Sequence, residues 1–286
     1  MAHSSDRIDE KSFFYYNNVM TQLPDTLIFL RHGRTISNEV YSARRQRKPV
    51  DAELEKQVMS TPDWKIPLND AGLEQAHAAR NWIDEHLGGL AAFDGLFSSY
   101  FTRCRHTAGL LGPTDNAMWQ IDDTLAGQLC GMYAVLCLAD IKARHPEAEA
   151  LGAMSPWYAA YPGGESGPMM RERYRSFANE KLANSNMASA LIVAHAGLIG
   201  AARYHIEHLL PEEQESEWAN DSMPIRNGAF LLYGKDSTDD TTSESYTRRR
   251  IVVPGLHDSG WVAINSHGQY SQEDLLAQVD NIYGTN

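Results

Sequence analysis

Two short apolar runs in this 286-residue chain each end at a histidine that glycine follows closely. Leu27–Leu30 leads into Arg31-His32-Gly33, and Leu191–Ala194 leads into His195-Ala196-Gly197. Open α/β sheets bind ligands at the carboxyl ends of their strands, where both histidines would lie. The pattern therefore predicts one pocket that holds two imidazoles with arginine side chains beside them.

His32 has the surroundings of a nucleophile toward phosphorus. Gly33 lets the chain turn and lets a ligand approach the backbone. Arg31 and Arg34 are always charged and suit phosphate oxygens, and Asn38 adds a neutral donor. A neutral imidazole among these cations would attack phosphorus and form an N-phosphohistidine. An isolated Arg-His-Gly tripeptide is more simply a surface pair, so the prediction depends on the other segments.

Arg103 and His195 are the candidate partners of His32. Arg103 follows a predicted strand at the start of a predicted helix, where free N–H groups and the helix dipole favour anions. We expect Arg103 to bind phosphate; the alternative is that it lies along the helix surface. We expect His195 to donate a hydrogen bond to phosphoryl oxygens and stabilise their charge; the alternative is a buried histidine of the core.

The remaining pattern predicts helices that alternate with strands. Helices are expected over residues 70–87, 102–111, 133–144, 172–182 and 198–209, and strands over 27–30, 95–98, 190–194, 229–233 and 250–253. Asn69 or Asp70 would cap the first helix, and Gly88-Gly89 would end it. The alternation implies a three-layer α/β/α fold with a mostly parallel sheet. Residues 39–66 are expected to be irregular and charged.

Composition limits the class of protein. No Pro/Gly/Ser-rich linker divides the chain, so we expect a single domain over residues 1–286. A net charge of -12 argues against nucleic-acid binding, and no apolar run reaches the ~20 residues of a membrane span. The three cysteines lack metal-ligand spacing and the N-terminal segment lacks an apolar signal core, which indicates a reduced, cytoplasmic protein. We expect no cofactor.

Six segments in order resemble motifs of the histidine phosphatase superfamily, branch 1, which has the phosphoglycerate mutase-like fold. Leu30–Asn38 resembles LxRHGxTxxN, Pro67–Ala76 resembles PLTxxGxxQA, Ser98–Ala108 resembles SSxxxRxxxTA, Pro162–Ser166 equals PGGES, Val193–Gly197 resembles VxHxG, and Asn227–Ala229 resembles the asparagine before the next strand.

The resemblance implies that His32 is the phosphorylated nucleophile and that no metal takes part. Arg31, Arg103 and His195 would complete the phosphate pocket. The reaction would be phosphoryl transfer to His32, followed by release to water or to a second hydroxyl. We expect the substrate-binding residues to be Arg34, Asn38, Glu165, Ser166, Ala196 and Gly197.

The chain departs from the family pattern where the proton donor is expected. The segment Leu125–Gly131 matches LxExxxG, but Gly127 stands in place of the glutamate. Loss of a general acid costs about 10²–10⁴-fold in rate, and least where the leaving group needs no proton. Either Asp122, Asp123 or Glu165 supplies the proton, or the substrate is a phosphoramidate, acyl phosphate or pyrophosphate. Two further explanations stay open: hydrolysis has been given up, or the residue was replaced deliberately to trap a complex.

A second departure is length. Asn38 and Pro67 are nearly thirty residues apart, against about ten in shorter members of the family, so residues 39–66 are read as an inserted segment. The insertion carries the cluster Arg44-Arg45-Gln46-Arg47-Lys48. It would be either a lid that reads the rest of the substrate or a solvated loop.

We therefore expect a phosphatase that acts on a small phosphorylated metabolite through phospho-His32. The alternative is a member of the fold that is catalytically silent or non-hydrolytic and binds a phosphorylated ligand or partner. A biosynthetic enzyme that reuses the anion pocket is a further alternative. A homodimer is compatible with the sequence; nucleic acid and membrane are not expected partners.

Overall fold

The computed structural model describes residues 23–46, 48–112, 117–131, 143–160, 162–183, 185–210, 225–235, 245–264, 271–273 and 276. Its strands are β1 Thr26–Arg31, β2 Gly95–Ser99, β3 Gln120–Asp122, β4 Ser189–Ala194, β5 Phe230–Gly234, β6 Arg248–Val253, β7 His257–Asp258 and β8 Val262–Ala263. Its α-helices are α2 Ile36–Arg45, α3 Ala52–Ser60, α4 Asp70–Leu87, α5 Thr102–Leu110, α7 Pro146–Met154, α8 Gly167–Phe177 and α9 Ala196–Ile206. Short 3₁₀ turns are η1 Asp63–Lys65, η2 Leu90–Ala92 and η3 Asp123–Leu125, and the π-helical turn η5 Ala178–Leu182 follows α8.

The strands form one mixed sheet in the order β3-β2-β4-β1-β5-β6-β7, and β8 also pairs with β6. The strands β3, β2, β4 and β1 pair in parallel, whereas β5 pairs with β1 in the antiparallel direction and begins an antiparallel edge. The predicted three-layer α/β/α fold with parallel central strands is confirmed. Because β1 and β4 are parallel neighbours, their carboxyl ends, and with them His32 and His195, lie at the same edge.

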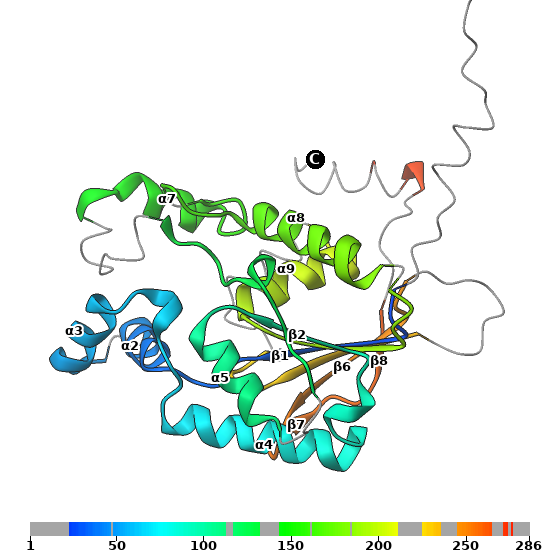
Figure 1. Cartoon of the computed structure of the whole chain (residues 1–286). Coiled ribbons are helices and arrows are strands. Elements are labelled where there is room, and N and C mark those ends of the chain that lie inside the picture. The colour runs from blue at the N-terminus through cyan, green and yellow to red at the C-terminus, as the bar shows by residue number, and fades with distance from the viewer. Residues whose placement is uncertain are drawn as a thin grey trace, which may run out of the picture.

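Alternating residues of β1 point to opposite faces of the sheet, and each face is covered by helices. Leu27 and Phe29 lie in a fully buried cluster with side chains of α8 and α9. Ile28 and Leu30 lie in a second buried cluster with side chains of α4 and α5. Figure 1 shows α8 and α9 above the sheet and α4 and α5 below it. Burial of each such side chain stabilises the fold by about 1.5–3 kcal/mol.

Helix α4 begins and ends where the sequence predicted. The Asn69 side chain accepts a hydrogen bond from the Gly72 amide at 2.9 Å, which satisfies one of the free N–H groups of the first turn. Gly88 ends the helix with φ of 80°, a left-handed conformation that favours glycine. Both predicted end signals of this helix are confirmed.

The expectation of irregular structure over residues 39–66 is wrong. Helix α2 continues to Arg45, α3 begins after Asp51, whose carboxylate accepts from the Leu54 amide at 2.8 Å, and η1 follows. These elements bury a small apolar cluster of their own, made of Val40, Val58 and Ile66. The apolar positions are few and far apart in sequence, so the charged run between them hides the helical spacing. In Figure 1, α2 and α3 lie at the left, beyond the carboxyl end of β1.

Other boundaries differ less. Helix α8 begins at Gly167, five residues before the predicted start, because proline is tolerated in a first helical turn. Most of the predicted helix 133–144 lies outside the described residues. Strands β3, β7 and β8 have two or three residues each and were not predicted.

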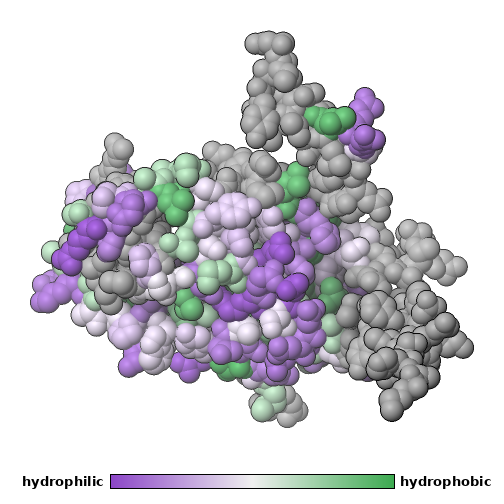
Figure 2. All heavy atoms as spheres, turned by 90° about the horizontal axis from the view of Figure 1, so that it is seen from above, coloured by the Kyte–Doolittle hydropathy of each residue, from purple (hydrophilic) through white to green (hydrophobic). Residues whose placement is uncertain are grey.

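The face seen in Figure 2 has hydrophilic and hydrophobic residues intermixed. Exposed apolar side chains on the elements α7 and α8 include Leu151, Met154 and Met169. Within the described part of the chain, no helix is both long and apolar enough to cross a membrane.

Candidate active site

His32 lies at the carboxyl end of β1 and is held by backbone on two sides. Its amide donates to the Ala194 carbonyl of β4 at 3.0 Å, and its side chain is buried. Its Nδ1 lies 2.7 Å from the Gly33 carbonyl oxygen. A carbonyl can only accept, so Nδ1 carries the proton, and the lone pair of the neutral ring is on Nε2.

The pKa of His32 lies well below its ordinary value of 6.5. Burial is the main cause, because it disfavours the charged imidazolium, and the positive charges of Arg103 and Arg31 act in the same direction. The ring is therefore neutral near pH 7, which is the form that can attack phosphorus.

His195 is the residue before helix α9, and its ring faces His32. The two ring centroids are 5.1 Å apart, with an interplanar angle of 64°. Its Nδ1 accepts from Nε of Arg103 at 3.4 Å, while Nε2 lies 3.0 Å from Oγ of Ser99 and 3.3 Å from Sγ of Cys104. An arginine N–H can only donate, so the proton of the neutral ring is on Nε2. Burial and then the Arg103 charge lower the pKa of His195 well below 6.5.

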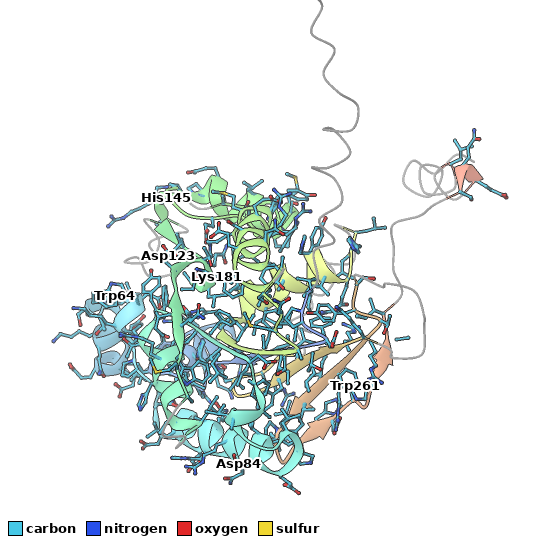
Figure 3. All side chains as sticks on the ribbon, turned by 45° about the vertical axis from the view of Figure 1, so that its right-hand side comes forward. Trp64, Asp84, Asp123, His145, Lys181 and Trp261 are labelled. Carbon is cyan, nitrogen blue, oxygen red and sulfur yellow. The ribbon has the colours of Figure 1, made fainter. Side chains whose placement is uncertain are left out.

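Arg103 is buried beside His195, although a surface position was the alternative. It is 7% exposed and lies in the first turn of α5. Its Nη1 and Nη2 contact the Asp63 carboxylate oxygens at 3.1 and 3.2 Å, and Nη1 also donates to the Asp63 carbonyl at 2.7 Å. Asp63 was not among the site residues predicted from the sequence. Trp64, the next residue of η1, is labelled in Figure 3 beside the helices of the segment 36–60.

Two glycines allow the turn after His32 to pack directly on helix α4. A Cβ on Gly33 would lie 2.4 Å from the Gly72 carbonyl oxygen, and a Cβ on Gly72 would lie 2.0 Å from the Arg34 carbonyl oxygen. The Gly33 amide donates to Oγ1 of Thr107, which itself donates to the Arg103 carbonyl. The glycines of the first two motifs and the threonine of the third therefore fix one turn.

Arg31, Arg34 and Asn38 surround this turn. Arg31 donates from Nη1 to the Ile225 carbonyl at 2.8 Å. Asn227 donates from Nδ2 to the His32 carbonyl at 3.0 Å and to Oδ1 of Asn38 at 3.2 Å. The Arg34 guanidinium has no hydrogen bond or ion pair with any residue that the structure describes. Arg34 is half-buried and comes two residues after His32 in this turn.

Glu165 is tied to a neighbouring loop and not to the histidines. Its carboxylate binds Arg173 at 2.9 and 2.8 Å and accepts from the Leu129 amide at 3.0 Å. Arg173 also donates to the carbonyls of Ala126 and Gly127. The pair therefore shapes the loop that carries Gly127. Ser166, buried next to Glu165, is the residue before helix α8 and makes no side-chain capping bond there.

Of the three carboxylates considered as replacements for the missing acid, two have other contacts and one is exposed. Asp122 caps η3 by accepting from the Thr124 amide at 2.9 Å, Asp123 is exposed, and Glu165 is paired with Arg173. A Cβ on Gly127 would lie 3.2 Å from Cγ and Nδ1 of His195, so position 127 does adjoin the site.

The structure thus brings His32, His195 and Arg103 together, with the Arg31 charge acting on both histidines. Ala196 and Gly197 follow His195 in the first turn of α9 and are half-buried. Asp63, Ser99, Cys104 and Arg173 were missed by the sequence analysis. For Ser99, its place in the SSxxxR motif was a signal that was not used.

Comparison with known proteins gives a family and a set of similar folds. The model of the histidine phosphatase superfamily (branch 1) matches residues 27–224. None of the curated proteins compared with the chain matches it. An alpha-ribazole phosphatase from Shigella flexneri superposes with a TM-score of 0.55 at 18% identity, over 74% of this chain and 91% of its own. A putative alpha-ribazole-5'-P phosphatase from Escherichia coli gives 0.57 at 16% identity, over 87% and 100%. The mycobacterial glucosyl-3-phosphoglycerate phosphatase gives 0.53 at 22% identity, over 73% and 92%.

Proposed function

The chain belongs to branch 1 of the histidine phosphatase superfamily, and from this premise we propose that it is a phosphatase with His32 as nucleophile. Its substrate is a small phosphorylated metabolite. One observation supports this most: the His32 ring is neutral, its Nδ1 is bound to the Gly33 carbonyl, and Nε2 carries the lone pair. The similar structures named as phosphatases of small phosphorylated compounds agree with this class of substrate.

In the first step, Nε2 of His32 attacks phosphorus and the bond from phosphorus to the leaving oxygen breaks. Arg31, Arg34 and Arg103 bind the phosphoryl oxygens and offset their charge. Positioning and charge stabilisation supply most of the rate in such transfers. In the second step, water attacks phosphorus, the phosphorus–nitrogen bond breaks, and phosphate leaves.

His195 can donate to a phosphoryl oxygen only after it gains a second proton. In the free protein, Nδ1 of His195 accepts a hydrogen bond from Nε of Arg103, and the single ring proton is on Nε2. A bound dianion neutralises Arg103 and adds negative charge, which removes one cause of the low pKa of His195. We therefore assign to His195 a donor role that begins when the phosphoryl group binds.

We further propose that residues 1–286 form one domain, with residues 39–66 as an inserted segment. Helices α2 and α3 and the turn η1 fill most of this segment, and Asp63 joins it to Arg103. The segment is thus bound through Asp63 to Arg103, the residue that we propose binds phosphate.

The test is phosphate release from a panel of phosphorylated metabolites, with His32→Ala as the control. We expect release that disappears in His32→Ala, and labelled phosphate that stays on the wild-type protein after an acid-free quench. Release that is unchanged in His32→Ala would refute the role of His32.

A second candidate function is binding of a phosphorylated ligand without hydrolysis. The absence of a carboxylate at Gly127 favours it. Tight binding of panel members, with no phosphate release and no label on His32, would establish this function in place of the phosphatase.

A further inference from the structure

A carboxylate lies on the arginine that is proposed to bind phosphate. The two oxygens of Asp63 lie 3.1 and 3.2 Å from Nη1 and Nη2 of Arg103. Paired N–H···O contacts of this kind are also how a guanidinium holds a phosphate. Asp63 therefore occupies the two terminal donors that a phosphoryl group would use.

Gly127 approaches the same group of side chains from another segment. A Cβ at this position would lie 3.2 Å from Nδ1 of His195, the atom that Nε of Arg103 approaches at 3.4 Å. A longer side chain at position 127 would thus begin beside the Arg103–His195 pair. Because residue 127 is a glycine, its loop provides no carboxylate at this edge of the His195 ring.

The charge of Asp63 acts on the pKa of Cys130, which follows Gly127 on the same loop. Burial and, after it, the Asp63 charge raise the pKa of the Cys130 thiol to about 11, while the Arg103 charge acts in the opposite direction. Asp63 and the segment 127–130 therefore lie within interaction range around one guanidinium.

We propose that Asp63 is the proton donor for the leaving group, in place of the glutamate that the family pattern puts at position 127. The proposal rests on the proposed phosphatase function. It differs from the sequence-based candidates because Asp63 comes from the segment 39–66 and contacts Arg103 directly.

Substrate binding would make Asp63 ready to donate. A phosphoryl dianion competes for the terminal N–H groups of Arg103 and displaces the carboxylate. The Asp63 side chain is 39% exposed, so it can take from water the proton that it donates.

The proton balance closes over the two steps. As Nε2 of His32 bonds to phosphorus, the leaving oxygen takes the carboxyl proton of Asp63 and departs as an alcohol. The Asp63 carboxylate then accepts a proton from the attacking water, while the phosphorus–nitrogen bond breaks. Phosphate leaves, and both His32 and protonated Asp63 are restored.

The test is the dependence of kcat/KM on the leaving group in Asp63→Asn, with glycerol 2-phosphate, phenyl phosphate and p-nitrophenyl phosphate as substrates. We expect a loss of about 10²–10⁴-fold for the alkyl phosphate and less than about 10-fold for p-nitrophenyl phosphate, whose leaving group needs no proton. Glu53→Gln removes an exposed carboxylate from α3 of the same segment, makes the same change in charge, and should leave all three values unchanged.

Three outcomes would overturn the proposal while the phosphatase function stands. An equal loss for all substrates would mean that Asp63 only holds Arg103 in place. Higher activity with all substrates, together with stronger inhibition by inorganic phosphate, would mean that Asp63 only competes for Arg103. Unchanged values would leave it without a role. A wild-type protein that neither releases phosphate nor labels His32 would instead refute the proposed function itself.

A second variant tests whether position 127 and Asp63 have the same task. In the Asp63→Asn background, Gly127→Glu is compared with Gly127→Ala, which reports the cost of the added Cβ against His195. We expect the glutamate to raise kcat/KM for glycerol 2-phosphate at least 10-fold over the alanine, and to change p-nitrophenyl phosphate little. If Gly127→Glu and Gly127→Ala have the same kcat/KM for both substrates, a carboxylate at position 127 does not replace Asp63, and this part of the proposal is overturned.

Discussion

Arg173 binds both carboxylate oxygens of Glu165 and, with the rest of its guanidinium, the backbone that leads to Gly127. The two side chains are 16% and 10% exposed, and the carbonyls of Thr124, Ala126 and Gly127 complete the contacts of Arg173. The PGGES loop is thereby attached to the loop beside His195. From these contacts we expect Glu165 to position this loop, and its role in substrate binding stays a prediction.

Arg173→Met should destabilise the protein by about 3–5 kcal/mol, because it leaves a largely buried carboxylate without its partner. The loop beside His195 would also lose its support, so activity on all substrates should fall. Urea denaturation and phosphate release measure the two effects. Arg171→Met is the matched control: its ion pair with Glu172 is exposed, so the loss should stay within about 1 kcal/mol. Equal losses in the two variants would contradict the role given to Arg173.

Acidification should destabilise the fold through His32 and His195. Both have a folded-state pKa well below 6.5, so below about pH 6.5 the unfolded chain binds more protons than the folded one. Stability is then lost as the pH falls from 6.5 toward the lowered pKa values, by up to about 1.4 kcal/mol per pH unit for each histidine. In melting curves between pH 7.5 and 5.5, His195→Asn should show a shallower fall in Tm than the wild type. The exposed His77→Gln is the control, and an identical slope for His195→Asn and wild type would contradict this account.

Gly33→Ala should destabilise the protein by at least about 1–3 kcal/mol and abolish activity. The added Cβ would lie 2.4 Å from the Gly72 carbonyl oxygen, so backbone must move at the turn that holds His32. Gly109→Ala provides the matched control, because an added Cβ there meets nothing within 4 Å in helix α5. It should stabilise the protein by about 0.5–1 kcal/mol and leave activity unchanged. Urea denaturation of the two variants distinguishes a site-specific clash from a general effect of alanine.

The fold and the central histidines could be predicted because their signals are local. A buried strand is a short apolar run, and a helix end is marked by residues such as Asn69 and Gly88. Parallel pairing then places the residues after β1 and β4 at one edge without further information.

Asp63 and Arg173 could not be predicted in the same way. Asp63 acts on Arg103, forty positions further along the chain, and Arg173 reaches carbonyls more than forty positions before it. Such contacts leave no periodicity, and a lone charged residue is ordinarily a solvated one. The helices of residues 39–66 were missed for a related reason, since their few buried apolar residues form a small cluster of their own.

The small cluster of Val40, Val58 and Ile66 shares no residue with the two clusters that cover the faces of the sheet. The apolar contacts of the α2–α3 unit are largely internal, so its surface can change without disturbing the packing of the sheet. Asp63 nevertheless joins this unit to Arg103, the residue that we propose binds phosphate. New substrate preferences can therefore arise in this chain at little cost to folding, and random mutagenesis confined to residues 36–66 should yield altered selectivity more often than unfolded protein.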